Sequence, residues 1–148
     1  MAAALRAAAD KGDIAEVSRL LEVQDAATLR KIINSQDSET DLAPLTLAAA
    51  GGHQNCVAAL LAARANPDLS VEDAGNRTAL HMAAYDAHVE VAQLLLEARA
   101  DACLMSSGGT PSDIVSQRAK EWRIGGGDGE EDIDRLNKIL ALLSGADR

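Results

Sequence analysis

The sequence predicts an all-α repeat solenoid, a stack of helix–turn–helix units. Alanine and leucine dominate an apolar fraction of 47%, whereas the 148 residues include no Phe, one Tyr and one Trp. Both dominant residues are strong helix formers, and a β-sandwich or barrel would need more β-branched and aromatic side chains. A segment that recurs along the chain, with paired leucines at helical spacing, completes the prediction.

The recurring segment is seen when residues 43–53 are laid over residues 78–88, at an offset of 35. An offset of 40 links residues 5–21 to residues 45–61, and a fourth unit begins at Thr110. The shared plan is a Thr/Pro start, an Ala-rich helix, a break at Gly-His or Gly-Asp, and a second helix with Val and paired Leu. Such a helix pair buries its apolar face only by stacking on its neighbours.

These motifs resemble ankyrin repeats, whose units read Thr-Pro-Leu-His-x-Ala-Ala, then Gly-His, then Val and Leu-Leu, then Gly-Ala-Asp. The match is strong in the second and third units, good in the first and partial in the fourth. The resemblance implies hairpin-like finger loops between the helix pairs and a single domain over residues 1–148, with repeats at approximately 1–36, 37–72, 73–105 and 106–148.

The departures from the repeat pattern predict local differences. Arg64 and Arg99 stand where the resemblance implies a Gly at positive φ, so these two turns are expected to be either strained or built differently. The first unit exceeds the period of 33 by about seven residues, and the apolar side chains within 29–33 are expected to add a helical turn. Ser112 and Asp113 replace Leu and His, which suits a divergent C-terminal capping repeat.

The fourth unit also carries an insertion rich in glycine and acidic residues. Its part over 124–131 is expected to be a flexible, solvated loop ahead of a final helix near 132–143. Neither a phosphate-binding loop nor a calcium loop fits its residues, because the lysine of the first and the sixth-position glycine of the second are missing. Trp122 is expected to pack under the final helix as capping core, with partner contact as the alternative.

Composition bears on the classes of partner. A net charge of −9 disfavours nucleic acid, since nothing is gained from neutralising phosphates. No apolar run approaches the roughly 20 residues that span a bilayer, so no membrane partner is expected. Two cysteines, Cys56 and Cys103, make no disulfide framework and suit a reducing compartment, which predicts a cytoplasmic or nuclear protein. The sequence has no heptad seam, so a monomer is expected.

Catalytic and metal-binding readings are the remote alternatives. His53 and His88 occupy the Gly-His position of the repeat, and His81 occupies its Thr-Pro-Leu-His position, so the repeat accounts for all three histidines. Cys56 falls where Val is usual and is interpreted as a small buried hydrophobe. No recognisable catalytic motif occurs. We therefore expect no enzyme, no cofactor and no metal.

The resemblance implies that a partner protein binds to a concave surface of inner helices and finger loops. The chain would be an adaptor or a stoichiometric inhibitor, with a structural subunit of a larger assembly as the alternative. Expected contacts are the positions that the repeat leaves variable: Asp10, Lys11, Tyr85, Asp86, Gln117 and Arg118 on the inner helices, and Asp41, Leu42, Asp73, Asn76 and Arg77 on the fingers.

Among these positions, Tyr85 is the foremost candidate. It is one of two aromatic residues in the chain, and interface hot spots favour Tyr, Trp and Arg. The alternative is that its ring only covers neighbouring alanines. The four acidic candidates would give the same face a negative charge, which predicts a partner with a basic surface.

Overall fold

The computed structural model describes residues 1–22, 25–36, 38, 42–70, 72, 75–125 and 130–146. Within these ranges it contains nine helices and no strand, which confirms the all-α repeat solenoid. In chain order the helices are α1 Ala2–Lys11, α2 Ile14–Glu22, α3 Ala26–Ile33, α4 Pro44–Ala50, α5 Gln54–Ala62, α6 Ala79–Tyr85, α7 Val89–Glu97, α8 Pro111–Gly125 and α9 Glu130–Ala146.

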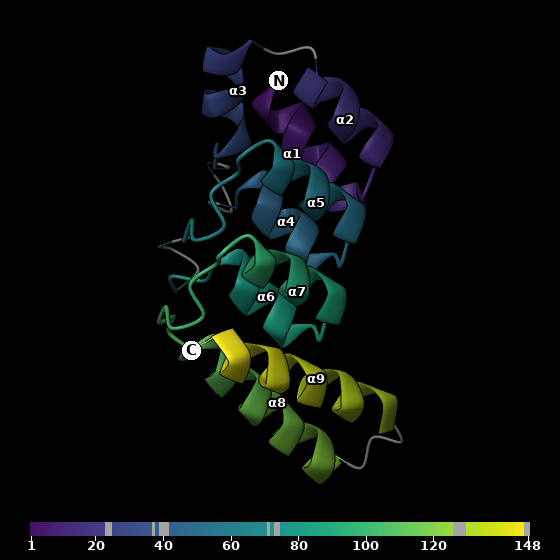
Figure 1. The fold of residues 1–148 in the computed structure, drawn as a ribbon, viewed down its shortest axis with the longest axis vertical. Coiled ribbons are helices and arrows are strands. Elements are labelled where there is room, and N and C mark those ends of the chain that lie inside the picture. The colour runs from purple at the N-terminus through teal and green to yellow at the C-terminus, as the bar shows by residue number, and fades with distance from the viewer. Residues whose placement is uncertain are drawn as a thin grey trace.

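The helices form two layers that run the length of an elongated molecule (Figure 1). Helices α1, α4, α6 and α8 pack one on the next as the inner layer, and α2, α5, α7 and α9 form the outer layer. Small buried residues line the inner stack, including Ala48–Ala49 and Ala83–Ala84, while Leu60 and Leu95 fill the space between the layers. The repeated sequence therefore folds into helix pairs that each bury their apolar faces against the next.

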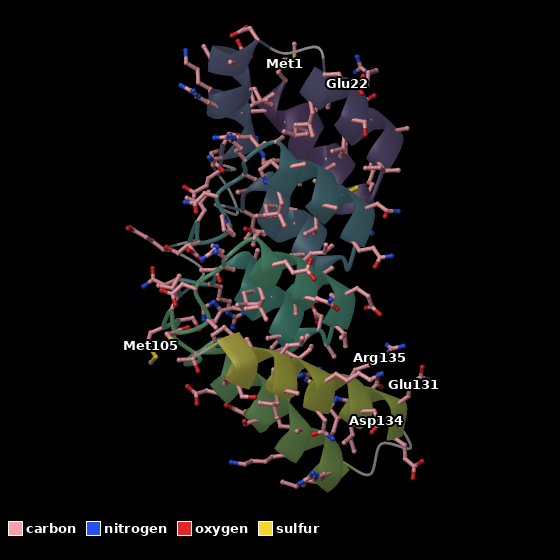
Figure 2. All side chains as sticks on the ribbon, in the orientation of Figure 1. Met1, Glu22, Met105, Glu131, Asp134 and Arg135 are labelled. Atoms are coloured by element: carbon pink, nitrogen blue, oxygen red, sulfur yellow. The ribbon has the colours of Figure 1, made fainter. Side chains whose placement is uncertain are left out.

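Three loops project to one side of the helices, and we call them the first, second and third fingers (Figure 1). Their described residues are 34–36, 38 and 42–43 in the first, 63–70, 72 and 75–78 in the second, and 98–110 in the third. In the third finger, Ser106 and Gly109 form an antiparallel bridge. Met105, in the same finger, is 64% exposed and points away from the helices (Figure 2).

The extra residues of the first unit form α3, which lies beside α1 on the side of the fingers (Figure 1). Asp25 caps this helix, because its Oδ1 accepts hydrogen bonds from the main-chain nitrogens of Ala27 and Thr28 at 3.0 and 2.9 Å. The buried side chains of Ile32 and Ile33 hold it against the core. The helical turn expected over 29–33 is confirmed and extends to eight residues.

The turns that follow the outer helices keep the repeat's left-handed backbone without its glycine. Arg64 has a φ of 67° and Arg99 a φ of 64°. Of the two expectations, strain at this position is the one that the structure bears out, since non-Gly residues rarely adopt positive φ.

The fourth unit reproduces the helix pair with a changed cap. The main-chain nitrogen of Thr110 donates to Oδ2 of Asp113 at 2.9 Å, as that of Thr78 donates to Nδ1 of His81 at 3.1 Å. Asp113 therefore replaces the repeat's histidine in closing the first turn of α8. These same hydrogen bonds from Thr110 hold the pKa of the Asp113 carboxyl below its usual value.

The loop expected over 124–131 in the fourth unit is partly helical. Helix α8 continues to Gly125 and α9 begins at Glu130, so only residues 126–129 of the expected 124–131 loop separate the two helices, and these lie outside the described residues. Glu130, Glu131 and Asp132 stand in the first turn of α9, where acidic side chains favour helix over loop. The half-buried Trp122 packs against the hydrophobic core, which is the capping role expected for it.

Candidate partner-binding surface

Tyr85 ends α6, and its ring is held by arginines from two other segments. The side chain is 43% exposed. The guanidinium carbon of Arg118, on α8, lies 4.5 Å from the ring centroid, and that of Arg77, in the second finger, lies 5.9 Å from it. Both distances fall within cation–π range. Arg118 is also fixed to the end of α6, because its Nε donates to the main-chain oxygen of Tyr85 at 3.2 Å.

These three side chains share a pocket of about 170 Å³ at the junction of the third and fourth units. We call it the Arg77–Arg118 pocket. It is lined by Arg77, Tyr85, Gly108, Ile114, Gln117, Arg118 and Glu121.

Glu121 brings a negative charge to this pocket. One carboxylate oxygen lies 3.6 Å from Nη1 of Arg118, and the other accepts a hydrogen bond from Nε2 of Gln117 at 3.3 Å. Two cationic side chains and one carboxylate thus line the same space. The two arginines and the one glutamate give the lining of the pocket a net charge of +1, although the chain as a whole carries a net charge of −9.

The structure brings four of the expected contact residues together, since Arg77, Tyr85, Gln117 and Arg118 all line the pocket. Asp86 follows directly as the exposed C-cap of α6. The other described candidates do not line the pocket: exposed Asn76 in the second finger, half-buried Leu42 before α4, and exposed Asp10 and Lys11 at the end of α1. Asp41 and Asp73 lie outside the described residues.

The contact between Arg118 and Tyr85 was not predicted from the sequence. The signal was present, because the offset of 32 between Thr78 and Thr110 carries Tyr85 onto Gln117, next to Arg118. Residues at one register in adjacent units of a solenoid lie side by side. Ile114 and Glu121 then follow from helical spacing, because they stand three residues before and four residues after Gln117 on the same helix.

The histidines occupy structural positions between the units. Nε2 of His53 donates to the main-chain oxygen of Asp10 at 2.9 Å, and Nε2 of His88 donates to that of Ala50 at 3.0 Å. Their rings lie against Gly12 and Gly52, both at a φ of 71°, where a Cβ would collide with the imidazole. Among the residues described, no three side chains of His, Cys, Asp or Glu come together as a metal site would require.

His81 is almost fully buried at the base of the third finger, at 1% exposure. Its Nδ1 accepts from the main-chain nitrogen of Thr78, so its Nε2 carries the proton and lies 3.0 Å from the oxygen of Leu104 and 3.2 Å from that of Gly109. Burial lowers the pKa of this imidazole below its usual value, and the two carbonyls only partly offset that effect.

Comparison with known proteins agrees with this architecture. A family model described as ankyrin repeats, with 3 copies, matches residues 3–106. The matched segment ends in the third finger, so the α8–α9 pair lies beyond it. Proteins of this family generally act as protein–protein interaction modules and are generally not enzymes. Within the described ranges, no helix has the length and apolarity needed to cross a membrane. On the match over residues 3–106 and the stacked helix pairs, the chain belongs to the ankyrin repeat family.

Proposed function

We propose that this chain is an adaptor or stoichiometric inhibitor that binds one partner protein through its inner helices and fingers. Tyr85 is the observation that carries the proposal. An aromatic ring that is exposed, yet held in place by Arg118, loses little side-chain freedom on binding. Rigid aromatic anchors next to arginines are the composition of interface hot spots.

Charge supports a partner with a basic surface. The net charge of −9 would attract such a partner from a distance, and exposed Asp10 and Asp86 offer carboxylates on the inner helices. The association rate is expected to fall as salt rises from 50 to about 500 mM, because surface charges are screened over that range. A rate that does not change with salt would remove this part of the proposal. Cysteine content supports a cytoplasmic or nuclear location, and the absence of a heptad seam supports a monomer.

The test is a set of paired affinity purifications from the native source. One bait is the wild type and one carries Tyr85→Ala with Asp86→Arg. A matched control bait carries Gln93→Ala with Glu97→Arg, an exposed pair on α7 that makes the same change of charge on the outer layer. Circular dichroism first establishes that all three are equally helical.

A partner that is lost from the Tyr85→Ala, Asp86→Arg bait and kept by the other two would support the proposal. A partner kept by all three would place the binding site elsewhere and contradict it. Recovery of several subunits at fixed stoichiometry would instead favour the structural-subunit alternative.

A further inference from the structure

Arg77 carries an unusual unpaired donor. Its Nε is buried and forms no hydrogen bond within the part of the chain that the structure describes. Buried guanidinium nitrogens are normally bonded, because removing an N–H from water without a new acceptor is costly. The rest of this guanidinium lies 5.9 Å from the ring centroid of Tyr85, at the edge of the Arg77–Arg118 pocket. Arg77 therefore contributes to the pocket a cation whose hydrogen bonds are incomplete, and its buried Nε would meet an acceptor in the pocket only after a rotation of the side chain.

Arg118 supplies a second cation that is already oriented. Its Nε is committed to the main-chain oxygen of Tyr85, and its Nη1 lies 3.6 Å from the carboxylate of Glu121. At 3.6 Å that carboxylate forms an ion pair but not a good hydrogen bond. The remaining N–H groups of a guanidinium form a planar fork that matches a carboxylate.

The size of the pocket suits a single side chain. At about 170 Å³ it is smaller than the roughly 300 Å³ and above that hold small-molecule ligands. Ile114 and Gly108 add an apolar wall and a surface without a side chain, so a short aliphatic stem fits beside the arginines.

The charge balance selects among anions. Glu121 already contributes one negative charge next to Arg118. With Arg77 and Arg118 on the same lining, the net charge is +1, which a single carboxylate neutralises. A phosphoryl group, with nearly two negative charges, would leave the pocket with an excess of negative charge beside Glu121. The charge of the pocket therefore matches a carboxylate.

We propose that the Arg77–Arg118 pocket binds an aspartate or glutamate side chain of the partner protein, with Tyr85 as the surface on which its stem packs. This rests on the proposed function and deepens it, because it identifies one acidic anchor within an otherwise basic partner surface. In this arrangement Glu121 competes for Arg118 and weakens the complex.

The first experiment uses the isolated chain and two peptides, acetyl-Gly-Ala-Glu-Ala-Gly-amide and the same peptide with Gln. Arginine Nε–H resonances are followed by NMR as each peptide is added. The Glu peptide is expected to shift the Arg77 Nε–H and the Tyr85 ring signals in a saturable manner, and the Gln peptide is expected to leave them unchanged. Equal shifts with both peptides would overturn the proposal. Larger shifts with inorganic phosphate than with the Glu peptide at equal concentration would overturn the choice of carboxylate.

Three variants sharpen the test. Arg77→Gln is expected to lower the affinity for the Glu peptide by about tenfold, since a charge-assisted hydrogen bond is lost. Arg77→Lys keeps the charge but not the fork, and it is expected to lose most of the same affinity. Glu121→Gln is expected to bind the Glu peptide about threefold more tightly. If Arg77→Gln does not fold, Arg77→Lys and Glu121→Gln still decide, because unchanged affinity in both would refute the site.

The partner found with the wild-type bait separates this inference from the proposed function. Loss of binding with Arg77→Gln and a gain with Glu121→Gln would support both. Binding that depends on Tyr85 and Asp86 but not on Arg77 or Glu121 would overturn the acidic anchor and leave the proposed function standing. Specific peptide binding without any partner that depends on Tyr85 would contradict the proposed function, and the acidic anchor with it.

Discussion

Nε2 of His88 lies 3.0 Å from the main-chain oxygen of Ala50. A side chain at the start of the outer helix α7 thus bonds the last turn of α4, the inner helix of the preceding unit. The same bond recurs one unit earlier, between His53 and Asp10 at 2.9 Å. Neighbouring helix pairs are thus joined by hydrogen bonds as well as by apolar packing.

Replacement of His88 by Ala is expected to lower the free energy of unfolding by about 1–2 kcal/mol. The variant loses one hydrogen bond to a carbonyl and the packing of the ring on Gly52. Urea unfolding followed by circular dichroism measures the change. His53→Ala, with the same geometry, is expected to show a loss of similar size. Wild-type stability in both variants would show that these bonds contribute nothing net.

Stability is expected to fall as the pH is lowered past the pKa of an unfolded histidine, about 6.5. His81 has a lowered pKa in the folded state, chiefly through burial and in smaller part through repulsion from Arg77. Between its unfolded and folded pKa values, the unfolded chain binds a proton that the folded chain does not, so stability rises with pH there. Below the folded pKa this contribution levels off.

An NMR titration of the His81 ring gives the folded pKa directly, and urea midpoints measured from pH 7.5 to 5 give the linkage. His81→Gln is expected to flatten the pH dependence relative to the wild type. A ring that titrates at or above the ordinary histidine pKa would contradict the prediction.

Glycine at position 64 or 99 is expected to stabilise the fold by about 0.5–1 kcal/mol each. Arg64→Gly and Arg99→Gly relieve a left-handed residue with a Cβ, which outweighs the added freedom of the unfolded chain. Ala98→Gly is the matched control, because Ala98 has a φ of −79° and its replacement should destabilise. Thermal midpoints rank the three variants. A destabilised Arg99→Gly would mean that the arginine side chain makes a contact worth more than the strain.

Fluorescence of the single tryptophan is expected to report a half-buried indole. Trp122 on α8 packs against the core, so its emission should lie to the blue of free N-acetyltryptophanamide and be quenched less readily by acrylamide. Both properties should change together with helix content during unfolding. Emission identical to the free amide in the folded protein would reject the capping role.

Sequence alone predicts the stack of helix pairs because the offsets of 35 and 40 repeat the apolar residues themselves, such as Leu45 and Leu80. It also predicts α3, since Ile32 and Ile33 supply an apolar face. The Arg77–Arg118 pocket could not be predicted in the same way. Its side chains come from the second finger, α6 and α8, and the sequence does not give the path by which the finger brings Arg77 beside the two helices. Individual contact residues were identified, but their local cationic character was not, since a charge count ignores which side chains meet.

The backbone conformation at Arg64 and Arg99 is a second feature that the sequence does not determine. The repeat pattern marks both as departures, yet it does not say whether the backbone or the side chain yields. The hydrogen bonds that follow each arginine hold the left-handed turn in place. The main-chain nitrogen of Ala65 donates to the oxygen of Leu60 at 3.0 Å, and that of Ala100 donates to the oxygen of Leu95 at 2.9 Å.

The bases of the three fingers are bonded to one another. Oδ1 of Asn34 accepts from the nitrogen of Asn66 at 2.9 Å, and Oδ1 of Asp68 accepts from the nitrogen of Asp101 at 2.8 Å. These two hydrogen bonds connect the three loops into one continuous surface. Loop bases that are bonded to one another on folding have less freedom left to lose when a partner docks on them. A substitution that removes one of these bonds would therefore weaken docking without touching the partner.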